Sequence, residues 1–392
     1  MRRINGDAEL RIGIDGLHLF GAYSGVQNAQ ARTIEALRAQ YPQDHLTLYA
    51  PRDFKGPPAA AEEDQGLQIR RTWFKGRRRI IRTLWRNFRL QPNAYNDKCE
   101  LLHGATYSLP STLSMPAVLT LHDCIALSHP QFATPGSAKV QKRQLPKSAK
   151  LARRVMVPTE AVKAEALRLL DLKPEKIDVV PWGVGPEFKP IEDETLLEQA
   201  QKQWGLPDSF VLYVGTLEPK KNLKGLLRSF VAAKLNSKLP HALVIVGRNG
   251  WGVKDFPRDI HDHGARDYVF LTGYVPDQAL PLLYSLADLC VLPSHIEGFG
   301  MPVLEAMACG CPVMVSDAPA LVEVAGGAAR VCRVSGEKPY QELREAFEEL
   351  LGQKTSEKAR YALRGRGLQR VKQFTWQKTA ELTHKCYESA LT

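Results

Sequence analysis

The sequence predicts an α/β protein of two Rossmann-like domains, each a parallel sheet covered by helices. Its 392 residues exceed what one core holds, since a domain takes about 100–200 residues. Short apolar runs alternate with segments of helical periodicity, which is typical of a doubly wound sheet. Residues 173–190 are dense in proline and glycine, and we interpret them as the crossing between the two domains.

The first domain begins with a strand and a glycine-marked loop. Apolar runs predict strands at residues 10–15, 45–50, 118–122 and 155–157. Helical periodicity predicts helices over residues 26–39 and 160–170. Thr159 directly precedes the second of these helices and is its expected N-cap.

The second domain repeats the alternation more clearly. Strands are predicted at residues 210–214, 243–246, 268–271, 289–292 and 312–315. Helices are predicted at residues 223–234, 278–285, 302–308, 338–352 and 375–390. Ligands of such sheets bind beyond the carboxyl ends of the strands, so the loops after the strands are the places where we expect a site.

Composition excludes several other classes of protein. A content of 44% hydrophobic and 24% charged residues is typical of an ordinary soluble globular protein. No apolar stretch approaches the roughly 20 residues that span a bilayer, and the first residues lack the apolar core of a secretory signal. The seven cysteines are scattered, with no C-x-x-C pair, so we expect free thiols, no zinc site and a cytoplasmic protein.

Positive charge is concentrated in the first half of the chain. Residues 1–180 hold 28 Lys/Arg and 17 Asp/Glu, whereas residues 181–392 hold 25 of each. Such asymmetry points to an anionic partner for the first half. Basic residues are dense within 75–89, where they alternate with Ile80, Ile81, Leu84, Trp85 and Phe88, and again within 139–154.

The 75–89 segment predicts a basic amphipathic helix that docks on an anionic membrane surface, at the inner face of the cytoplasmic membrane. The alternative is a helix whose apolar side faces the core and whose arginines are solvated. Nucleic-acid binding is a rival class of function, but no nucleic-acid motif occurs and we expect no such partner.

The strongest chemical signal is the stretch Glu297-Gly-Phe-Gly-Met-Pro-Val-Leu-Glu305, directly after a predicted strand. Glycines let backbone N–H groups approach a ligand, and Pro302 suits the first turn of a helix whose N-terminus favours phosphate. Glu297 and Glu305 can then face different ends of one ligand. The alternative is an ordinary strand–turn–helix with two solvated glutamates.

Leu286–Gly310 closely resembles the E-x7-E region of the family 4 retaining glycosyltransferases. Tyr213–Leu223 (YVGTLEPKKNL) resembles the phosphate loop of that family. Further matches follow the family's order along nearly the whole chain, at Ile12–Gly25, Leu119–Asp123, Val179–Val184, Leu243–Trp251, Phe270–Pro276 and Phe374–Ala390.

The resemblance implies the GT-B fold, in which two Rossmann-like domains face each other across a cleft. It places an acceptor-binding domain at residues 1–183 and a nucleotide-sugar-binding domain at residues 184–373. The C-terminal helix, residues 374–392, is expected to return to the N-terminal domain.

For the donor, the resemblance implies that Glu297 contacts the sugar and Glu305 the ribose hydroxyls. Lys220 and Lys221 would neutralise the departing diphosphate, although the family often has Arg at the first position. The remaining donor residues that it implies are Gly298, Phe299, Gly300, Gly215, Thr216, Arg248, Tyr274 and Val275. From the residues alone, the alternatives are an exposed lysine pair at a helix start and an ordinary turn at Gly247–Trp251.

On the acceptor side, the resemblance implies His122 beside the transferring carbon, with Asp123, Gly16, Gly25 and Val26 lining the site. Without the resemblance, a lone histidine at a strand end is more often structural. Gln27 and Asn28 stand where the family commonly has an aromatic or basic residue, which leaves acceptor recognition open.

The activity implied is retaining, metal-independent transfer of a hexose to a glycan or polyprenyl-linked acceptor in cell-surface polysaccharide or lipopolysaccharide synthesis, without a cofactor. GDP-mannose is the donor we expect first, and UDP-sugars are the alternative. No Asp-x-Asp pair occurs in the donor region, and we expect the lysines to supply the positive charge. A double displacement through a protein nucleophile and a sugar-nucleotide epimerase on the same fold remain alternatives.

Overall fold

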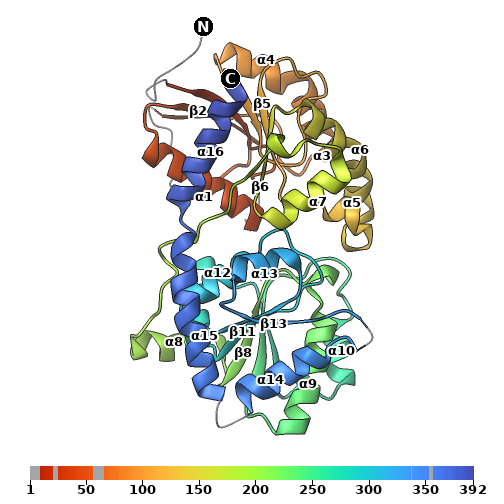
Figure 1. Cartoon of the computed structure of the whole chain (residues 1–392), viewed down its shortest axis with the longest axis vertical. Coiled ribbons are helices and arrows are strands. Elements are labelled where there is room, and N and C mark those ends of the chain that lie inside the picture. The colour runs from red at the N-terminus through yellow and green to blue at the C-terminus, as the bar shows by residue number, and fades with distance from the viewer. Residues whose placement is uncertain (1–8, 21–24, 56–65, 337, 353–355) are drawn as a thin grey trace. The chain divides into compact units, whose positions relative to one another are not determined.

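The computed structural model describes residues 9–20, 25–55, 66–336, 338–352 and 356–392. The chain forms two compact units (Figure 1). Unit 1 comprises Met1–Gly183 and Thr375–Thr392, and unit 2 comprises Val184–Phe374. The chain thus leaves unit 1 within the Pro/Gly-dense segment and re-enters it for its last helix.

The described part of unit 1 is built on a seven-stranded parallel sheet with the order β3-β2-β1-β4-β5-β6-β7. Its strands are β1 (Arg11–Asp15), β2 (His45–Ala50), β3 (Leu67–Arg71), β4 (Leu101–Gly104), β5 (Ala117–Thr120), β6 (Arg154–Val157) and β7 (Ile177–Val179). Its helices are α1 (Gly25–Gln40), α3 (Arg79–Trp85), the π-helical turn η1 (Arg86–Leu90), α4 (Gln91–Asn96), α5 (Ile125–Ser128), η2 (Pro130–Phe132), α6 (Pro135–Leu151), α7 (Glu160–Leu170), η3 (Pro174–Lys176) and α16 (Trp376–Leu391).

The last helix completes the core of unit 1. In Figure 1, α16 lies along α1, and the two helices are in contact. Tyr387 of α16 is buried, and its hydroxyl lies 2.9 Å from Nδ1 of His103 in β4. Because Cys386, Tyr387 and Ala390 belong to the same apolar cluster as β1 and α1, this face of the sheet depends on the C-terminal helix.

Unit 2 contains, within its described residues, a six-stranded parallel sheet with the order β10-β9-β8-β11-β12-β13. Its strands are β8 (Phe210–Val214), β9 (Ala242–Val246), β10 (Val269–Gly273), β11 (Leu289–Leu292), β12 (Val313–Ser316) and β13 (Arg330–Cys332). Its helices are α8 (Glu194–Trp204), η4 (Pro219–Lys221), α9 (Leu223–Ser237), α10 (Phe256–Asp262), η5 (Asp277–Ala279), α11 (Leu280–Leu286), α12 (Met301–Ala308), α13 (Pro319–Ala325), α14 (Gln341–Leu351), α15 (Ser356–Arg370) and η6 (Val371–Gln373).

Strand order explains where a site can form in each unit. The sheet of unit 1 reverses its winding between β1 and β4, and that of unit 2 reverses between β8 and β11. At such a point the loops leave the sheet in opposite directions and open a crevice beyond the strands. The loops concerned follow β1 at Asp15 in unit 1, and follow β8 and β11 at residues 215–221 and 293–300 in unit 2.

The structure confirms the α/β class and most predicted elements. β8 and β9 are buried along their whole length, as expected for strands covered on both faces. Thr159 caps α7 and accepts a hydrogen bond of 3.2 Å from the backbone N–H of Val162. The predicted strand at 118–122 ends earlier, at Thr120, and the predicted helix at 278–285 is divided between η5 and α11.

Several elements escaped the prediction. β7 lies inside the segment that we interpreted only as a crossing; it is three residues long and forms the edge of the sheet. α6 contains Pro146, which argues against a helix by local sequence, and the buried residues of α15 are Ser356, Leu363 and Gly367, which give no clear apolar period. In the described residues no helix is both long enough and apolar enough to cross a membrane.

Candidate active site

In unit 2 the loop after β8 is fixed to the loop after β9. The N–H of Gly215 donates to the carbonyl of Val246 (2.9 Å), and that of Leu217 donates to the carbonyl of Arg248 (2.9 Å). A Cβ at Gly247 would lie 1.9 Å from the carbonyl oxygen of Gly215, so only glycine permits this approach. The loop that carries the two predicted cations therefore has a rigid base.

Asn222 joins the loop after β8 to the loop after β11. Its backbone is left-handed (φ +57°), a conformation that Asn tolerates better than most residues, and it ends the turn η4. Its buried Nδ2 donates to the carbonyl of Pro293 (3.0 Å), and the N–H of His295 donates to the carbonyl of Lys220 (2.8 Å). The two loops at the winding reversal of this sheet thus form one structure.

Glu297 is the centre of a charged cluster at this place. Nζ of Lys221 lies 2.5 Å from Oε1 of Glu297, Nζ of Lys220 lies 3.8 Å from Oε2, and the hydroxyl of Ser294 donates to Oε1 (2.8 Å). The side chains of Glu297, Lys221 and Lys220 are 7%, 14% and 20% exposed. The alternatives of a solvated glutamate and an exposed lysine pair are therefore wrong.

The electrostatics of the cluster favour an ionised carboxylate. Burial alone would raise the pKa of Glu297, but Lys221 and Lys220 outweigh it and lower the pKa to about 2. One carboxylate beside two ammonium groups leaves an excess of one positive charge, so the cluster can attract a further anion.

Glu305 lies on α12 in a different environment. Its Oε2 accepts a hydrogen bond of 2.9 Å from the hydroxyl of Tyr284, which is buried on α11. Burial raises the pKa of Glu305 to about 7, because no cation offsets the loss of solvent as the lysines do at Glu297. The two glutamates of the motif therefore differ in charge state near neutral pH.

The Gly-Phe-Gly turn presents backbone, not a ring, at the start of α12. Gly300 has φ +104°, and a Cβ there would lie 2.4 Å from Leu321, so the turn requires glycine. The ring of Phe299 is buried and packs against Phe374 with the ring centroids 6.1 Å apart. Gly298 and Phe299 can therefore offer a ligand only their backbone groups.

Arg248 and Tyr274 form an aromatic–cation pair at the ends of β9 and β10. The guanidinium carbon of Arg248 lies 4.6 Å from the centroid of the Tyr274 ring, which is half exposed, while Val275 beside it is buried. A partly exposed planar pair of this kind is a surface on which a base can stack. Thr216 is exposed on the loop after β8.

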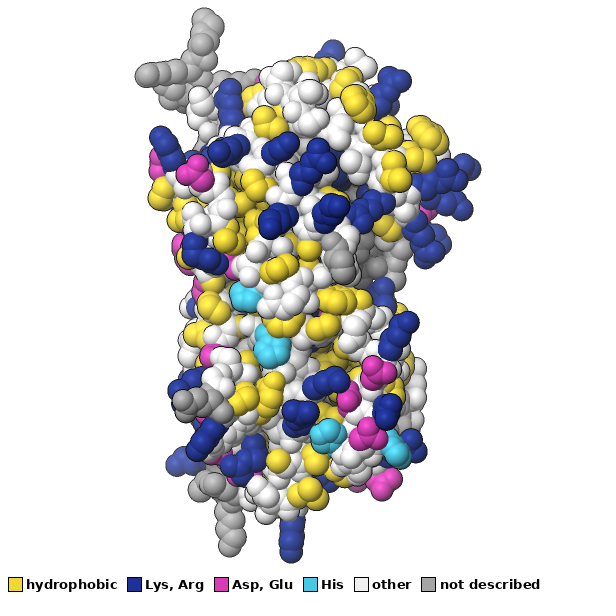
Figure 2. Space-filling model, turned by 90° about the vertical axis from the view of Figure 1, so that its right-hand side faces the viewer, with side chains coloured by type: hydrophobic (Ala, Val, Ile, Leu, Met, Phe, Trp, Pro, Cys, Tyr) yellow, Lys and Arg dark blue, Asp and Glu magenta, His cyan; other side chains and the backbone are white. Residues whose placement is uncertain are grey.

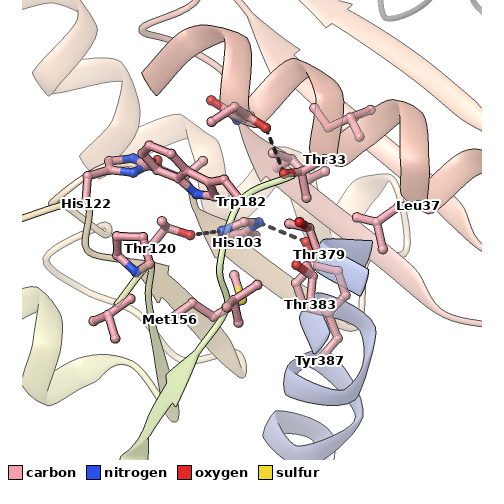
Figure 3. Close-up of a pocket in the computed structure, with 18 residues that line it drawn as sticks. Thr33, Leu37, His103, Thr120, His122, Met156, Trp182, Thr379, Thr383 and Tyr387 are labelled. Carbon is pink, nitrogen blue, oxygen red and sulfur yellow. Dashed lines mark hydrogen bonds between the residues drawn. The ribbon is translucent and has the colours of Figure 1, made fainter. Parts of the chain in front are cut away.

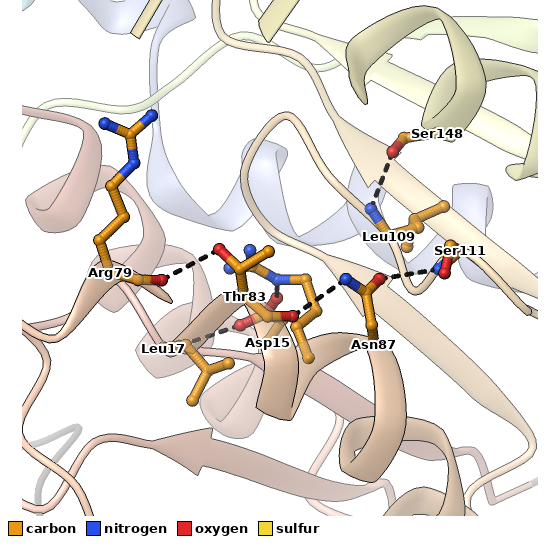
Figure 4. Close-up of polar contacts among 9 residues, drawn as sticks. Asp15, Leu17, Arg79, Thr83, Asn87, Leu109, Ser111 and Ser148 are labelled. Atoms are coloured by element: carbon orange, nitrogen blue, oxygen red, sulfur yellow. Dashed lines mark hydrogen bonds and ion pairs between the residues drawn. The ribbon is translucent and has the colours of Figure 1, made fainter. Parts of the chain in front are cut away.

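In unit 1, the loop after β1 surrounds a buried carboxylate. Asp15 is buried; its Oδ1 accepts from the N–H of Leu17 (3.0 Å, Figure 4), and its Oδ2 accepts from Nε of Arg86. The N–H of Gly16 donates to the carbonyl of Tyr49 (3.0 Å). His18 follows with both ring nitrogens buried and unpartnered among the described residues, and burial lowers its pKa to about 3.

His122 follows β5 and is buried. Its Nε2 lies 2.9 Å from the carbonyl oxygen of Ala105, and burial lowers its pKa, so the ring is neutral and Nε2 carries the proton. Nδ1 is then an acceptor without a partner in the described structure. The neighbouring Asp123 accepts from the hydroxyl of Tyr107 (3.0 Å) and from the N–H of Ile125 (3.1 Å).

A small cavity of about 40 Å³ adjoins His122 inside unit 1 (Figure 3). Trp182 lies at the same end, with its ring 5.6 Å from that of His122. On the cavity wall His103 lies between Thr120 (2.7 Å) and Tyr387 (2.9 Å). The cavity has room for an ordered water within reach of polar groups.

Gly25 and Val26 begin α1, with Gly25 exposed and Val26 half-buried. Gln27 comes next in the chain, where the family commonly has an aromatic or basic residue, and it has a structural role. Nε2 of Gln27 donates to the carbonyls of His18 (2.8 Å) and Phe20 (3.2 Å). Gln27 thus holds the start of α1 against the loop after β1.

The structure adds site residues that the sequence did not single out: His18, Tyr107, Asn222, Tyr284 and Ser294. The prediction that the basic residues of 75–89 dock on a membrane surface is wrong for Arg86. Its side chain cannot face lipid, because it is buried in an ion pair with Asp15. Arg82 is also engaged: it donates to the carbonyl of Gly76 (2.8 Å) and lies over the ring of Phe20.

No cluster of three or more His, Cys, Asp or Glu side chains in the described residues has metal-binding geometry, and all seven cysteines are free and buried.

Two protein families match consecutive parts of the chain: Glycosyltransferase Family 4 matches residues 23–188, and Glycosyl transferases group 1 matches residues 196–367. The O-antigen chain mannosyltransferase B of Escherichia coli is 29% identical over 292 residues, which are 74% of each chain. The serotype-specific mannosyltransferase WbdA of Escherichia coli is 27% identical over 284 residues, but the match covers 69% of this chain and only 34% of WbdA.

Among solved structures, sucrose-phosphate synthase from Thermosynechococcus elongatus is similar with a TM-score of 0.77 and 19% identity, over 97% of this chain and 98% of that chain. The likeness is one of fold. It agrees with the two parallel-sheet domains described above and confirms the predicted fold class. By its two family matches and its architecture, the chain belongs to the family 4 glycosyltransferases of group 1 and has the GT-B fold.

Proposed function

We propose that this glycosyltransferase moves mannose from GDP-mannose to a glycan or polyprenyl-linked acceptor in the synthesis of a cell-surface polysaccharide or lipopolysaccharide, with retention at the anomeric carbon. The observation that carries the proposal is the cluster of Lys221, Lys220 and Glu297 at the winding reversal of the unit 2 sheet. Mannose as the sugar is supported by the two relatives, both of which are mannosyltransferases by name.

In this mechanism the lysines act on the leaving group. Negative charge grows on the diphosphate as its bond to the sugar breaks, and fixed cations stabilise that charge without reorganising. Lys221 and Lys220 supply it, so the transfer is proposed to need no metal and no cofactor. Glu297, ionised and held by Ser294, accepts hydrogen bonds from sugar hydroxyls, and the acceptor attacks on the face from which the diphosphate leaves.

The nucleotide is proposed to bind beyond the carboxyl ends of the unit 2 strands, next to the lysine cluster. Glu305 accepts hydrogen bonds from the ribose hydroxyls, the base stacks at Arg248 and Tyr274 beside Val275, and backbone groups of residues 298–300 and of the 215–216 loop hold the diphosphate. On the acceptor side we propose Gly16, Gly25, Val26, Asp123 and His122, whose free Nδ1 can accept a hydroxyl hydrogen bond.

Membrane association is a further part of the proposal. Figure 2 shows Lys and Arg side chains among hydrophobic ones on the upper half of one face, the side of unit 1 on which Figure 1 draws α3, α5 and α6. On α3 and η1, Ile80, Leu84 and Phe88 are 76%, 52% and 70% exposed. Exposed apolar residues flanked by Arg77, Arg78 and Arg89 support docking of residues 75–89 on an anionic leaflet, with the protein peripheral on the cytoplasmic face.

Two alternatives differ in chemistry. A UDP-sugar transferase of the same family would use the same cluster with another base, and an epimerase would convert the nucleotide sugar into its epimer without an acceptor product. A screen of nucleotides and nucleotide sugars for thermal stabilisation separates the donors, since a ligand at 100 times its Kd stabilises by about 2.7 kcal/mol. Product analysis with the stabilising donor then identifies transfer, and NMR of the new linkage identifies its anomeric configuration.

The roles of the two glutamates can be separated by calorimetric titration with the bare nucleoside diphosphate. Glu305→Ala should weaken binding, whereas Glu297→Ala should leave it nearly unchanged but reduce transfer from the full donor. The reverse ranking would contradict the proposed roles. Turnover that survives thorough chelation of divalent ions would support the metal-independent step, and its loss would contradict it.

A further inference from the structure

We propose that a second cavity on unit 1, separate from the residues assigned to transfer, binds a phosphate or diphosphate group. The cavity lies between α3, η1, α6 and the loop after β4, and its volume is about 300 Å³. One water occupies about 30 Å³ of liquid, so the space exceeds that of a few waters. We call it the α3–α6 cavity.

The charges that line this cavity are all positive. Arg143 and Lys147 lie four residues apart on α6, so they occupy one face of the helix, and Arg86 lines the inner end. No carboxylate is among the lining residues, and within the described chain neither Arg143 nor Lys147 has one within 4.0 Å. Two like charges at this spacing repel each other, and an anion between them would remove that cost.

Two basic side chains near the C-terminal end of α6 differ from this pair, because each has an acidic neighbour. Lys150, one turn beyond Lys147, lies 3.7 Å from Asp171, and Arg154 pairs with Asp178. Arg86, which lines the cavity, is itself paired, because its Nε donates to the carboxylate of Asp15. The negative charge of Asp15 is therefore already neutralised by Arg86, and it would repel a phosphate in the cavity only weakly.

Neutral donors complete the wall. The hydroxyls of Ser108 and Ser111 line the cavity and form no hydrogen bond within the described structure. Ser148 accepts from the N–H of Leu109 (3.0 Å), so its own O–H remains available to donate. Phosphate oxygens only accept, and they bind most strongly to groups of this kind: guanidinium, ammonium and hydroxyl donors.

Asn87 makes the wall rigid. Its Oδ1 accepts from the N–H of Ser111 (3.0 Å), and its Nδ2 donates to the carbonyl of Thr83 (3.0 Å), as Figure 4 shows. These bonds tie the loop after β4 to α3 and η1, so the donors are held in place without a ligand. Preorganised donors lose little entropy on binding, which raises affinity.

The position of the cavity suggests what carries the phosphate. Leu84 and Phe88 follow Thr83 and Asn87 of its wall directly in the chain, and both are exposed. A phosphate ester on a long apolar chain would satisfy both the donors and these side chains. Either an anionic phospholipid or a polyprenyl phosphate has this chemistry, and free diphosphate has only the polar half of it.

The test compares two double variants on the same helix. Arg143→Gln/Lys147→Gln removes two exposed charges that line the cavity, and Lys139→Gln/Lys142→Gln removes two likewise exposed charges outside its lining. Binding is measured at about 0.15 M salt, where charges farther apart than about 8 Å are screened. The probes are inorganic pyrophosphate, neutral phosphatidylcholine vesicles containing a polyprenyl phosphate, and the same vesicles containing phosphatidylglycerol instead.

We expect the cavity variant to bind at least one probe about tenfold more weakly, because charge-assisted hydrogen bonds are lost, and the control to change less than about twofold. Pyrophosphate binding lost only in the cavity variant identifies a phosphate site as such. Loss confined to one vesicle type identifies that lipid as the source. Equal losses in both variants, or no binding of any probe by the wild type, would overturn the proposal. The readout is binding, so it stands independently of the donor chemistry proposed above.

Discussion

Arg86 and Asp15, 71 residues apart in sequence, form a buried ion pair that joins η1 to the end of β1. Their side chains are 9% and 1% exposed. The pair thus fixes the loop after β1, with Gly16 and His18, to the helical segment that carries the exposed Ile80, Leu84 and Phe88.

Removing one partner of this pair should be costly. Arg86→Gln leaves the Asp15 carboxylate buried without its cation, and we expect the free energy of unfolding to fall by about 3–5 kcal/mol. Chemical denaturation measures the change. Arg89→Gln, an exposed neighbour, is the matched control and should shift stability by less than about 0.5 kcal/mol. A similar small effect for Arg86→Gln would mean that the ion pair contributes little.

Lys221→Ala tests the leaving-group role. Turnover should fall on the order of 100-fold, because a fixed cation at the developing charge is lost. Lys224→Ala, an exposed lysine one helical turn away whose partner is Asp259, should keep near wild-type turnover. Circular dichroism establishes that both variants are folded before rates are compared. Undiminished turnover in a folded Lys221→Ala protein would refute the assignment.

Glu305 predicts a specific pH dependence. Its pKa is raised to about 7 in the folded protein, above its unfolded value, so the folded state binds the extra proton between about pH 4.5 and 7. Stability should therefore fall as pH rises through this window and level off above it. Unfolding measured from pH 5 to 8 should show a smaller fall in Glu305→Gln, with the exposed Glu357→Gln as control.

Nucleotide binding gives a second readout of the same residue. If the ribose hydroxyls donate to the ionised carboxylate, the affinity of the wild type for nucleoside diphosphate should rise from pH 6 to 8. Glu305→Gln should lack that rise. A parallel rise in both proteins would place the titrating group elsewhere.

The exposed apolar residues on α3 and η1 predict vesicle binding. Replacing Ile80, Leu84 and Phe88 by Ser should release the protein from anionic vesicles, because these side chains would enter the interface. Replacing Arg77, Arg78 and Arg89 by Gln should weaken binding by about 1 kcal/mol per charge, and less at high salt. Leu235→Ser with Tyr361→Ser, two exposed sites in unit 2, is the control, and sedimentation with vesicles is the measurement. Binding that survives the triple Ser change would exclude this surface.

Local pattern was sufficient for much of the fold. β8 and β9 are apolar throughout because both faces of their sheet are covered, so composition alone indicated strands. The lysine loop and Glu297 were recognised because residues of the site lie within short, contiguous motifs. That they form one cluster depends on β8 and β11 being neighbours in the sheet.

The residues that escaped prediction are those whose role depends on distant partners. Nothing near Arg86 in sequence indicates that it faces Asp15. Moreover, η1 is π-helical from Arg86 to Leu90. The prediction of an amphipathic helix over residues 75–89 assumes the 3.6-residue period of an α-helix, and that period does not hold in η1. Tyr284 likewise bonds Glu305 because α11 and α12 pack against each other, and the local sequence of neither helix indicates that contact.

The return of α16 to unit 1 sets an order for folding during synthesis. Unit 2 is one uninterrupted stretch and can acquire its core while later residues are still being translated, whereas unit 1 lacks the Tyr387–His103 contact until α16 leaves the ribosome. The domain made first is therefore completed last. Until then the face of its sheet near α1 stays open, and a nascent chain stalled before Trp376 would expose that apolar surface to chaperones.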